Sequence, residues 1–71
     1  MPKPVEDPRI ATIAAMVRVV ATDARLDENE NAPPYERFSI CAGERMIGAP
    51  LMSPFHAWKN ALRRILAELG V

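Results

Sequence analysis

The chain has 71 residues, 49% of them hydrophobic, and its nine Lys and Arg side chains balance its nine Asp and Glu side chains. This length allows one domain, which buries only about 60% of the surface that the unfolded chain exposes. One cysteine, Cys41, excludes an intramolecular disulfide, and Cys41 with His56 offers too few ligands for a structural zinc site. The high apolar fraction favours burial of further surface between two copies, so we expect a homodimer.

The charge is unevenly distributed along the chain. Residues 1–36 carry four basic and seven acidic side chains (net −3), whereas residues 37–71 carry five basic and two acidic ones (net +3). The two halves can neutralise each other within the fold or across a dimer, and a mixed solvated surface is the simplest interpretation. With zero net charge, the sequence lacks the footprint of a strongly basic nucleic-acid-binding protein.

No segment of the sequence predicts export or membrane insertion. The start, MPKPVEDP, has two acidic residues and three prolines where a signal peptide needs an apolar stretch. The longest apolar region, residues 10–24, is interrupted by Arg18 and Asp23 and is too short to cross a bilayer. We therefore expect a cytoplasmic protein with no membrane contact, in keeping with one reduced cysteine.

Residues 1–7 are expected to form a flexible N-terminal arm, and residues 8–71 a single compact domain. Asp7 as N-cap and Pro8 at the first helical position predict the start of a helix. Apolar residues then follow at helical spacing: Ile10, Ile13, Ala14, Val17, Val20, Ala21 and Ala24. The competing interpretation is a strand over residues 16–22, which are rich in β-branched side chains.

Two further apolar residues, Met16 and Val19, widen this stripe beyond what one small core needs. We therefore predict that they form the dimer interface. Residues 27–34, DENENAPP, are acidic, carry amides and end in two prolines, so we expect a loop that separates the first helix from the next element.

The segment 35–49 alternates apolar and polar residues as a half-buried strand does, and Gly43-Glu44 suits the centre of a type II′ hairpin turn. Two facing pairs follow from this turn: Ile40 with Ile47, and Cys41 with Met46. The alternative is a short helix that opens at Pro34, which would give a three-helix bundle.

The last helix is predicted to begin with Ser53 as N-cap and Pro54 at its first position, and Gly70 could close it. One side of this helix is expected to carry the apolar residues Phe55, Trp58, Leu62, Ile65, Leu66 and Leu69. Trp58 lies in the middle of this stripe, which favours a place in the core over an exposed anchor for a partner.

A second side of the same helix aligns His56, Lys59 and Arg63, with Asn60 and Arg64 beside them. Such a stripe can pair with the carboxylates of a protein or lie along phosphates. The plainer interpretation is the solvated face of an amphipathic helix, with positive charge toward its C-terminal half. We predict that His56, Lys59, Arg63 and Arg64 form the partner-binding surface.

Catalytic patterns are nearly absent from the sequence. A Cys41–His56 pair is conceivable, because a thiolate nucleophile needs a base beside it, but no third residue stands out to orient the histidine. The sequence has no glycine-rich phosphate loop, no H-E-x-x-H and no G-x-S-x-G. We predict a protein that is not an enzyme and that needs no metal or cofactor.

Together these patterns predict an α+β fold: a small single domain, helix–β-hairpin–helix, with both helices on one face of the sheet. The order strand, turn, strand, Ser-Pro and tryptophan-containing helix loosely resembles that of small phage and prophage accessory proteins, and from this we expect a phage or mobile-element gene. We expect a protein-binding regulator or inhibitor that masks a partner surface. The alternatives are a nucleic-acid-associated regulator that uses the basic helix face and a structural homo-oligomer subunit.

Overall fold

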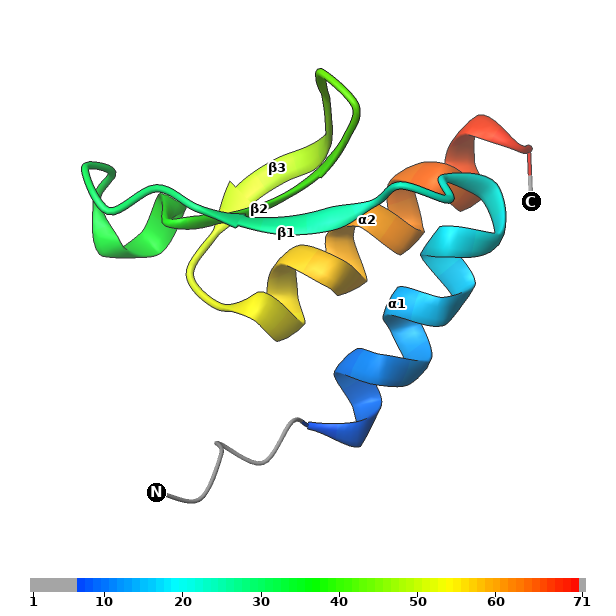
Figure 1. Cartoon of the computed structure of the whole chain (residues 1–71), viewed down its shortest axis with the longest axis horizontal. Helices are drawn as coiled ribbons and strands as arrows, with labels where there is room; N and C mark the ends of the chain where they lie inside the picture. Colours follow the sequence, from blue (N-terminus) through cyan, green and yellow to red (C-terminus); the bar gives the residue numbers. More distant parts are fainter. Residues whose placement is uncertain (1–6, 71) are drawn as a thin grey trace.

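The computed structural model describes residues 7–70 and has two helices on one side of a three-stranded sheet (Figure 1). The elements in chain order are α1 (Pro8–Val20), β1 (Arg25–Glu28), the short 3-10 helix η1 (Pro34–Glu36), β2 (Phe38–Ala42), β3 (Arg45–Leu51) and α2 (Pro54–Glu68). All strand pairs are antiparallel, in the order β1-β2-β3. The α+β prediction is confirmed, and the three-helix alternative is wrong. Residues 1–6 of the expected arm lie outside the described residues.

Both long helices begin at the predicted caps. The side chain of Asp7 accepts a hydrogen bond from the backbone N–H of Arg9 at 2.9 Å, and Ser53 Oγ accepts one from the N–H of His56 at 3.2 Å. A proline follows each cap, where its missing N–H costs nothing because that position has no partner within the helix. Neither helix has the length and apolar character that crossing a membrane requires.

The β2–β3 hairpin has the predicted register. Ile40 faces Ile47, and Cys41 faces Met46. Gly43 has φ +62°, and none of the non-glycine residues that the structure describes has positive φ, so the turn has the type II′ pattern. The helical alternative for this segment is limited to η1, which lies outside the hairpin.

The sequence analysis missed β1. Residues 27 and 28 were expected in a loop, yet Asp27 pairs with Ser39 and Glu28 pairs with Phe38. Charged residues are poor strand formers by themselves, and it is the neighbouring strand that holds them here. The first helix was also predicted to extend too far: α1 ends at Val20, and Ala24 is buried beyond its end.

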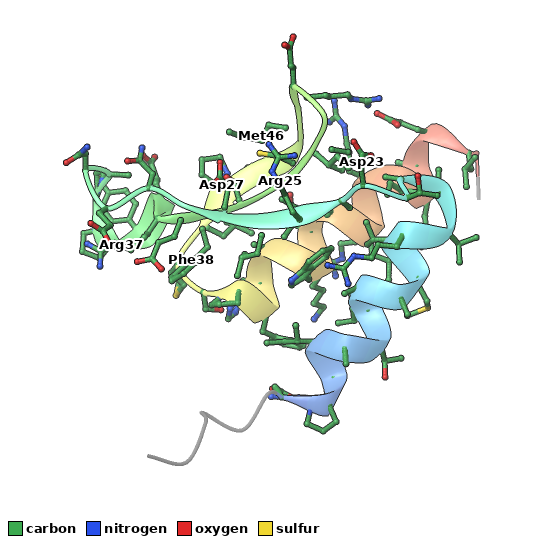
Figure 2. The ribbon with its side chains drawn as sticks, in the orientation of Figure 1. Asp23, Arg25, Asp27, Arg37, Phe38 and Met46 are labelled. Atoms are coloured by element: carbon green, nitrogen blue, oxygen red, sulfur yellow. The ribbon has the colours of Figure 1, made fainter. Side chains whose placement is uncertain are left out.

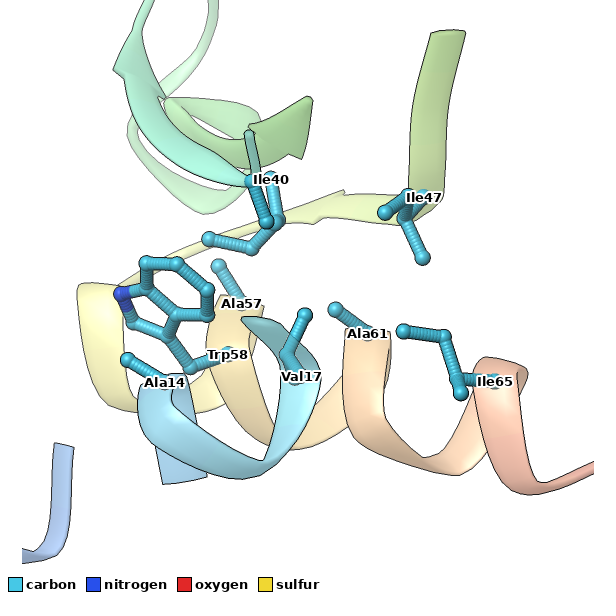
Figure 3. Close-up of a cluster of buried hydrophobic side chains, with 9 residues drawn as sticks. Ala14, Val17, Ile40, Ile47, Ala57, Trp58, Ala61 and Ile65 are labelled. Carbon is cyan, nitrogen blue, oxygen red and sulfur yellow. The ribbon is translucent and has the colours of Figure 1, made fainter. Parts of the chain in front are cut away.

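α2 lies at the centre of the core. Its buried side chains are Ala57, Trp58, Ala61 and Ile65, which meet Ile40 and Ile47 of the sheet and Ala14 and Val17 of α1 (Figure 3). Trp58 is 3% exposed, so its predicted place in the core is confirmed.

The predicted apolar stripe of α2 was wrong at its C-terminal end. Leu66 and Leu69 are 37% and 58% exposed, whereas Ala57 and Ala61 are buried. Because alanine has a small side chain, it lets the helix axis approach the sheet closely, and the helix turns this side inward. Hydrophobic periodicity gives alanine little weight because its side chain is small. The predicted buried side of α2 was therefore rotated toward Leu66 and Leu69.

Candidate binding surface beside α2 and β3

The four predicted partner-binding residues are all exposed on α2: His56, Lys59, Arg63 and Arg64. The structure places them beside β3, where they line two adjoining hollows of about 500 and 150 Å³. The larger hollow is lined by Arg45, Met46, Gly48, Ala49, Asn60, Arg63 and Arg64. The smaller one is lined by Leu51, His56, Lys59, Asn60 and Arg63. Because both share Asn60 and Arg63, we treat the two hollows as one surface, the basic groove.

A bulge in β3 forms the floor of the basic groove. Ile47 faces Ile40 and Leu51 faces Phe38, so residues 48–50 stand opposite Ser39 alone. The side chain of Asn60 reaches this bulge, and its Oδ1 accepts a hydrogen bond from the backbone N–H of Ala49 at 2.9 Å. We call this contact the Asn60 clamp.

Gly48 makes the Asn60 clamp possible. Its φ is +79°, a conformation that residues with a Cβ rarely adopt. A Cβ at this position would lie 2.2 Å from Oδ1 of Asn60, which is far inside van der Waals contact. The glycine therefore serves both the backbone bend and the close approach of α2.

The positive charges of the groove differ in how far they are neutralised. Arg45 and Arg64 both form ion pairs with Glu68, the second at 3.7 Å. Within residues 7–70, Lys59 and Arg63 form none. The Lys59 ammonium instead lies 5.8 Å from the ring centroid of Phe55. The groove thus keeps two basic side chains available for an external anion.

His56 has a local role at the start of α2. Its Nδ1 lies 2.6 Å from Ser53 Oγ, so the ring is tied to the capping residue of its own helix. An exposed imidazole held in this way can border the groove, but its orientation is set by the cap.

The conceivable Cys41–His56 pair is not formed. Cys41 lies on the face of the sheet that the helices leave open, with Sγ 4.0 Å from Oδ2 of Asp27. Figure 2 shows Asp27, Arg25 and Met46 on this same side. In the part of the chain from 7 to 70, no three His, Cys, Asp or Glu side chains gather in a group that could hold a metal ion.

Sequence reasoning missed the contributions of β3 to this surface, namely Arg45, Met46, Gly48, Ala49 and Leu51. Their place beside α2 depends on the bulge and on the packing of the helix against the sheet. The one available signal was the pair of glycines at 43 and 48, because an isolated glycine within a strand often marks a bulge.

The two predicted dimer residues are exposed on α1, Met16 at 46% and Val19 at 80%. Val20 is also exposed, so the outer side of this helix carries three large apolar side chains. Single exposed apolar residues are ordinary, but a cluster on one helix is typical of an interaction surface.

No family model, curated protein or solved structure matches this chain. Function is therefore inferred from the charges and shape of the basic groove and from the exposed side of α1.

Proposed function

We propose that this protein is a non-enzymatic regulator or inhibitor that binds an acidic surface of another protein through the basic groove and masks it. The observation that carries the proposal is the pair Lys59 and Arg63, which line the groove and form no ion pair within residues 7–70. Leu51, which is half-buried, borders them and supplies apolar contact area. Apolar anchors surrounded by complementary charge are typical of protein interfaces.

A protein partner is favoured over nucleic acid by the charge of the whole molecule. The chain has zero net charge, and Glu68 already neutralises part of the positive charge of Arg45 and Arg64. Binding to a phosphate backbone depends on several uncompensated cations, whereas one acidic patch on a protein can be matched by two.

Masking is the mechanism that suits a domain of this size. A standard interface buries about 800 Å² per partner, which is roughly 15% of the 5212 Å² surface of this chain. The partner would therefore also cover the surroundings of the groove, and no chemical step is needed. We propose that this takes place in the cytoplasm, where Cys41 stays reduced, and that the gene belongs to a phage or mobile element.

The test is affinity capture from a lysate of the cells that carry the gene, followed by mass spectrometry. The natural chain should retain one protein, with or without nuclease treatment, and the variant Lys59→Glu/Arg63→Glu should lose it. Arg25→Glu reverses a charge on the open face of the sheet and serves as the control, which should retain the partner.

Two other results would contradict the proposal. Salt-dependent binding to DNA or RNA, without protein capture, would identify a nucleic-acid-associated regulator. A large stable assembly of the chain alone would identify a structural homo-oligomer subunit. A homodimer is compatible with masking, and we propose that it forms through Met16 and Val19 on the exposed side of α1.

A further inference from the structure

A second groove, of about 560 Å³, lies between α1 and β1. The two elements diverge from the turn that joins them, and α2 passes behind them (Figure 1). The lining includes Ile10, Ala14 and Arg18 from α1, Leu26 from β1 and Trp58 from α2. We call this the α1–β1 groove. At 100° per residue, Trp58 projects from nearly the opposite side of α2 to Arg63, so this groove is separate from the basic groove.

Arg18 is the positive charge of the α1–β1 groove, and it is held in place by two contacts. Its Nε donates a hydrogen bond to the carbonyl oxygen of Ala24 at 3.0 Å, and its guanidinium carbon lies 5.1 Å from the Trp58 ring centroid. Within residues 7–70 it forms no ion pair, and its terminal nitrogens form no hydrogen bond. A guanidinium fixed in this way presents a planar pair of donors that suits a carboxylate.

β1 borders the groove with an edge that pairs with no other strand within residues 7–70. It is the outer strand of the sheet, and the ladder with β2 continues through a hydrogen bond of 2.8 Å from Asn29 N–H to the carbonyl oxygen of Arg37. Since hydrogen-bonding direction alternates along an antiparallel strand, Leu26 and Glu28 direct their backbone N–H and C=O groups away from β2. An extended segment could therefore pair with this edge.

We propose that the α1–β1 groove binds an extended, mainly aliphatic segment of a partner protein that carries one carboxylate. The backbone of the segment pairs with Leu26 and Glu28, its aliphatic side chains lie against Ile10, Ala14 and Leu26, and its carboxylate pairs with Arg18. This site is distinct from the proposed masking surface and does not depend on it.

The two ends of the groove differ in charge, which sets where the carboxylate lies. Asp7 lines the end opposite Arg18, and hydrogen bonds from Arg9 lower the pKa of its carboxyl group, so it is negative at neutral pH. Asp7 and Arg18 are eleven positions apart along α1, a rise of about 16 Å, which an extended segment of about five residues spans. Arg9 already neutralises Asp7 through an ion pair at 2.7 Å, so this end of the groove offers no uncompensated positive charge to a second acidic residue.

The test begins with selection of random dodecapeptides displayed against the immobilised full chain. We expect the selected peptides to share one Asp or Glu next to aliphatic residues. Binding of each synthetic peptide is then followed by the fluorescence of Trp58, which is the single tryptophan of the chain and lies in this groove. Replacing the acidic residue by its amide, or Arg18→Gln, should each weaken binding at least tenfold, and the two changes together should cost little more than either alone.

Two controls separate this site from folding and from the proposed function. Ala15→Glu adds a negative charge at an exposed position of the groove and should also weaken peptide binding, even if Arg18→Gln perturbs folding. The variant Lys59→Glu/Arg63→Glu should leave peptide binding unchanged. In the amide NMR spectrum, Leu26 and Glu28 should shift on peptide addition, and Ala49 beside the Asn60 clamp should not.

The proposal is overturned if selected peptides lack an acidic residue or bind Arg18→Gln and Ala15→Glu as well as the natural chain. Shifts confined to Ala49 and its neighbours would also overturn it. If Arg18→Gln and Ala15→Glu change self-association and not peptide binding, the occupant is a second copy of the chain and not a partner segment.

Discussion

α1 and α2 begin with the same device, a capping side chain followed by proline, but the protein uses them differently. α1 fully buries only Ala14 and Val17 and exposes Met16, Val19 and Val20. α2 buries four residues at the centre of the core and turns basic side chains outward. The helix with the longer apolar run is therefore the less buried one.

This difference shows that apolar composition does not measure burial. The buried side of α2 contains two alanines that allow close approach to the sheet, whereas Val19 of α1 is 80% exposed. We expect substitutions on the inner side of α2 to affect folding and substitutions on the outer side of α1 to affect association.

The largest expected effect is that of Trp58→Ala. Trp58 is 3% exposed and lies between α1 and the sheet, so its removal leaves a cavity that should cost about 3–5 kcal/mol of unfolding free energy. That is close to the whole stability expected of a domain this small, so the variant should unfold or melt far lower in circular dichroism. Val19→Ala, on the exposed side of α1, should change the unfolding free energy by less than about 0.5 kcal/mol. If the two substitutions lowered the unfolding free energy equally, the proposed difference between α2 and α1 would be wrong. A Trp58→Ala variant that folds but no longer binds its partner would show that Trp58 is an anchor for that partner.

Gly48→Ala tests how β3 is joined to α2. The new Cβ would collide with Asn60 Oδ1 and strain the backbone at φ +79°, so we expect a loss of about 2–3 kcal/mol in urea denaturation. The loss should be smaller in an Asn60→Ala background, where the collision is removed. Gly70→Ala, at φ +76° with nothing within 4 Å, should show the backbone strain alone. An identical loss with and without Asn60 would rule out the collision.

Val19→Glu tests the proposed dimer. Burial of an unpaired charge between two copies should weaken association by about 1–3 kcal/mol, measured by sedimentation, while the unfolding free energy of the monomer is unchanged. Met52→Glu alters an exposed apolar residue outside α1 and should leave association unaffected. A natural chain that sediments as a monomer at every concentration would end the dimer proposal.

The smallest effect on stability is expected for Lys59→Glu/Arg63→Glu. Both side chains are exposed on the outer side of α2, so the unfolding free energy should stay within about 1 kcal/mol of the natural value. The affinity for an acidic partner should fall by several kcal/mol, chiefly through slower association, in surface plasmon resonance. Unchanged affinity would direct the search for the partner site to the remaining surfaces, and loss of folding would show that this side of α2 supports the core.

Patterns of residues close together in the sequence predicted the parts of the fold that depend on short-range interactions. The two helix starts follow from Asp7 and Ser53, and the hairpin register follows from the glycine at 43. The outward direction of the basic side chains follows from helical spacing around Trp58.

The rest depends on contacts between distant segments. β1 consists of arginine, leucine and two acidic residues, and it becomes a strand because β2 pairs with it. The basic groove needs a bulge in β3 opposite Asn60, which no periodicity reveals. The α1–β1 groove therefore borders a strand that the sequence did not predict, and the basic groove borders a bulge that it did not predict.

The Asn60 clamp also has a consequence for the entropy of binding. Because Asn60 joins the backbone of Ala49 to the middle of α2, the basic groove cannot widen unless this hydrogen bond breaks. The groove therefore meets a partner already close to its bound shape. Binding then costs about 0.5–1.5 kcal/mol of entropy for each long basic side chain that becomes ordered. The backbone adds little to this cost because it has already lost its freedom on folding.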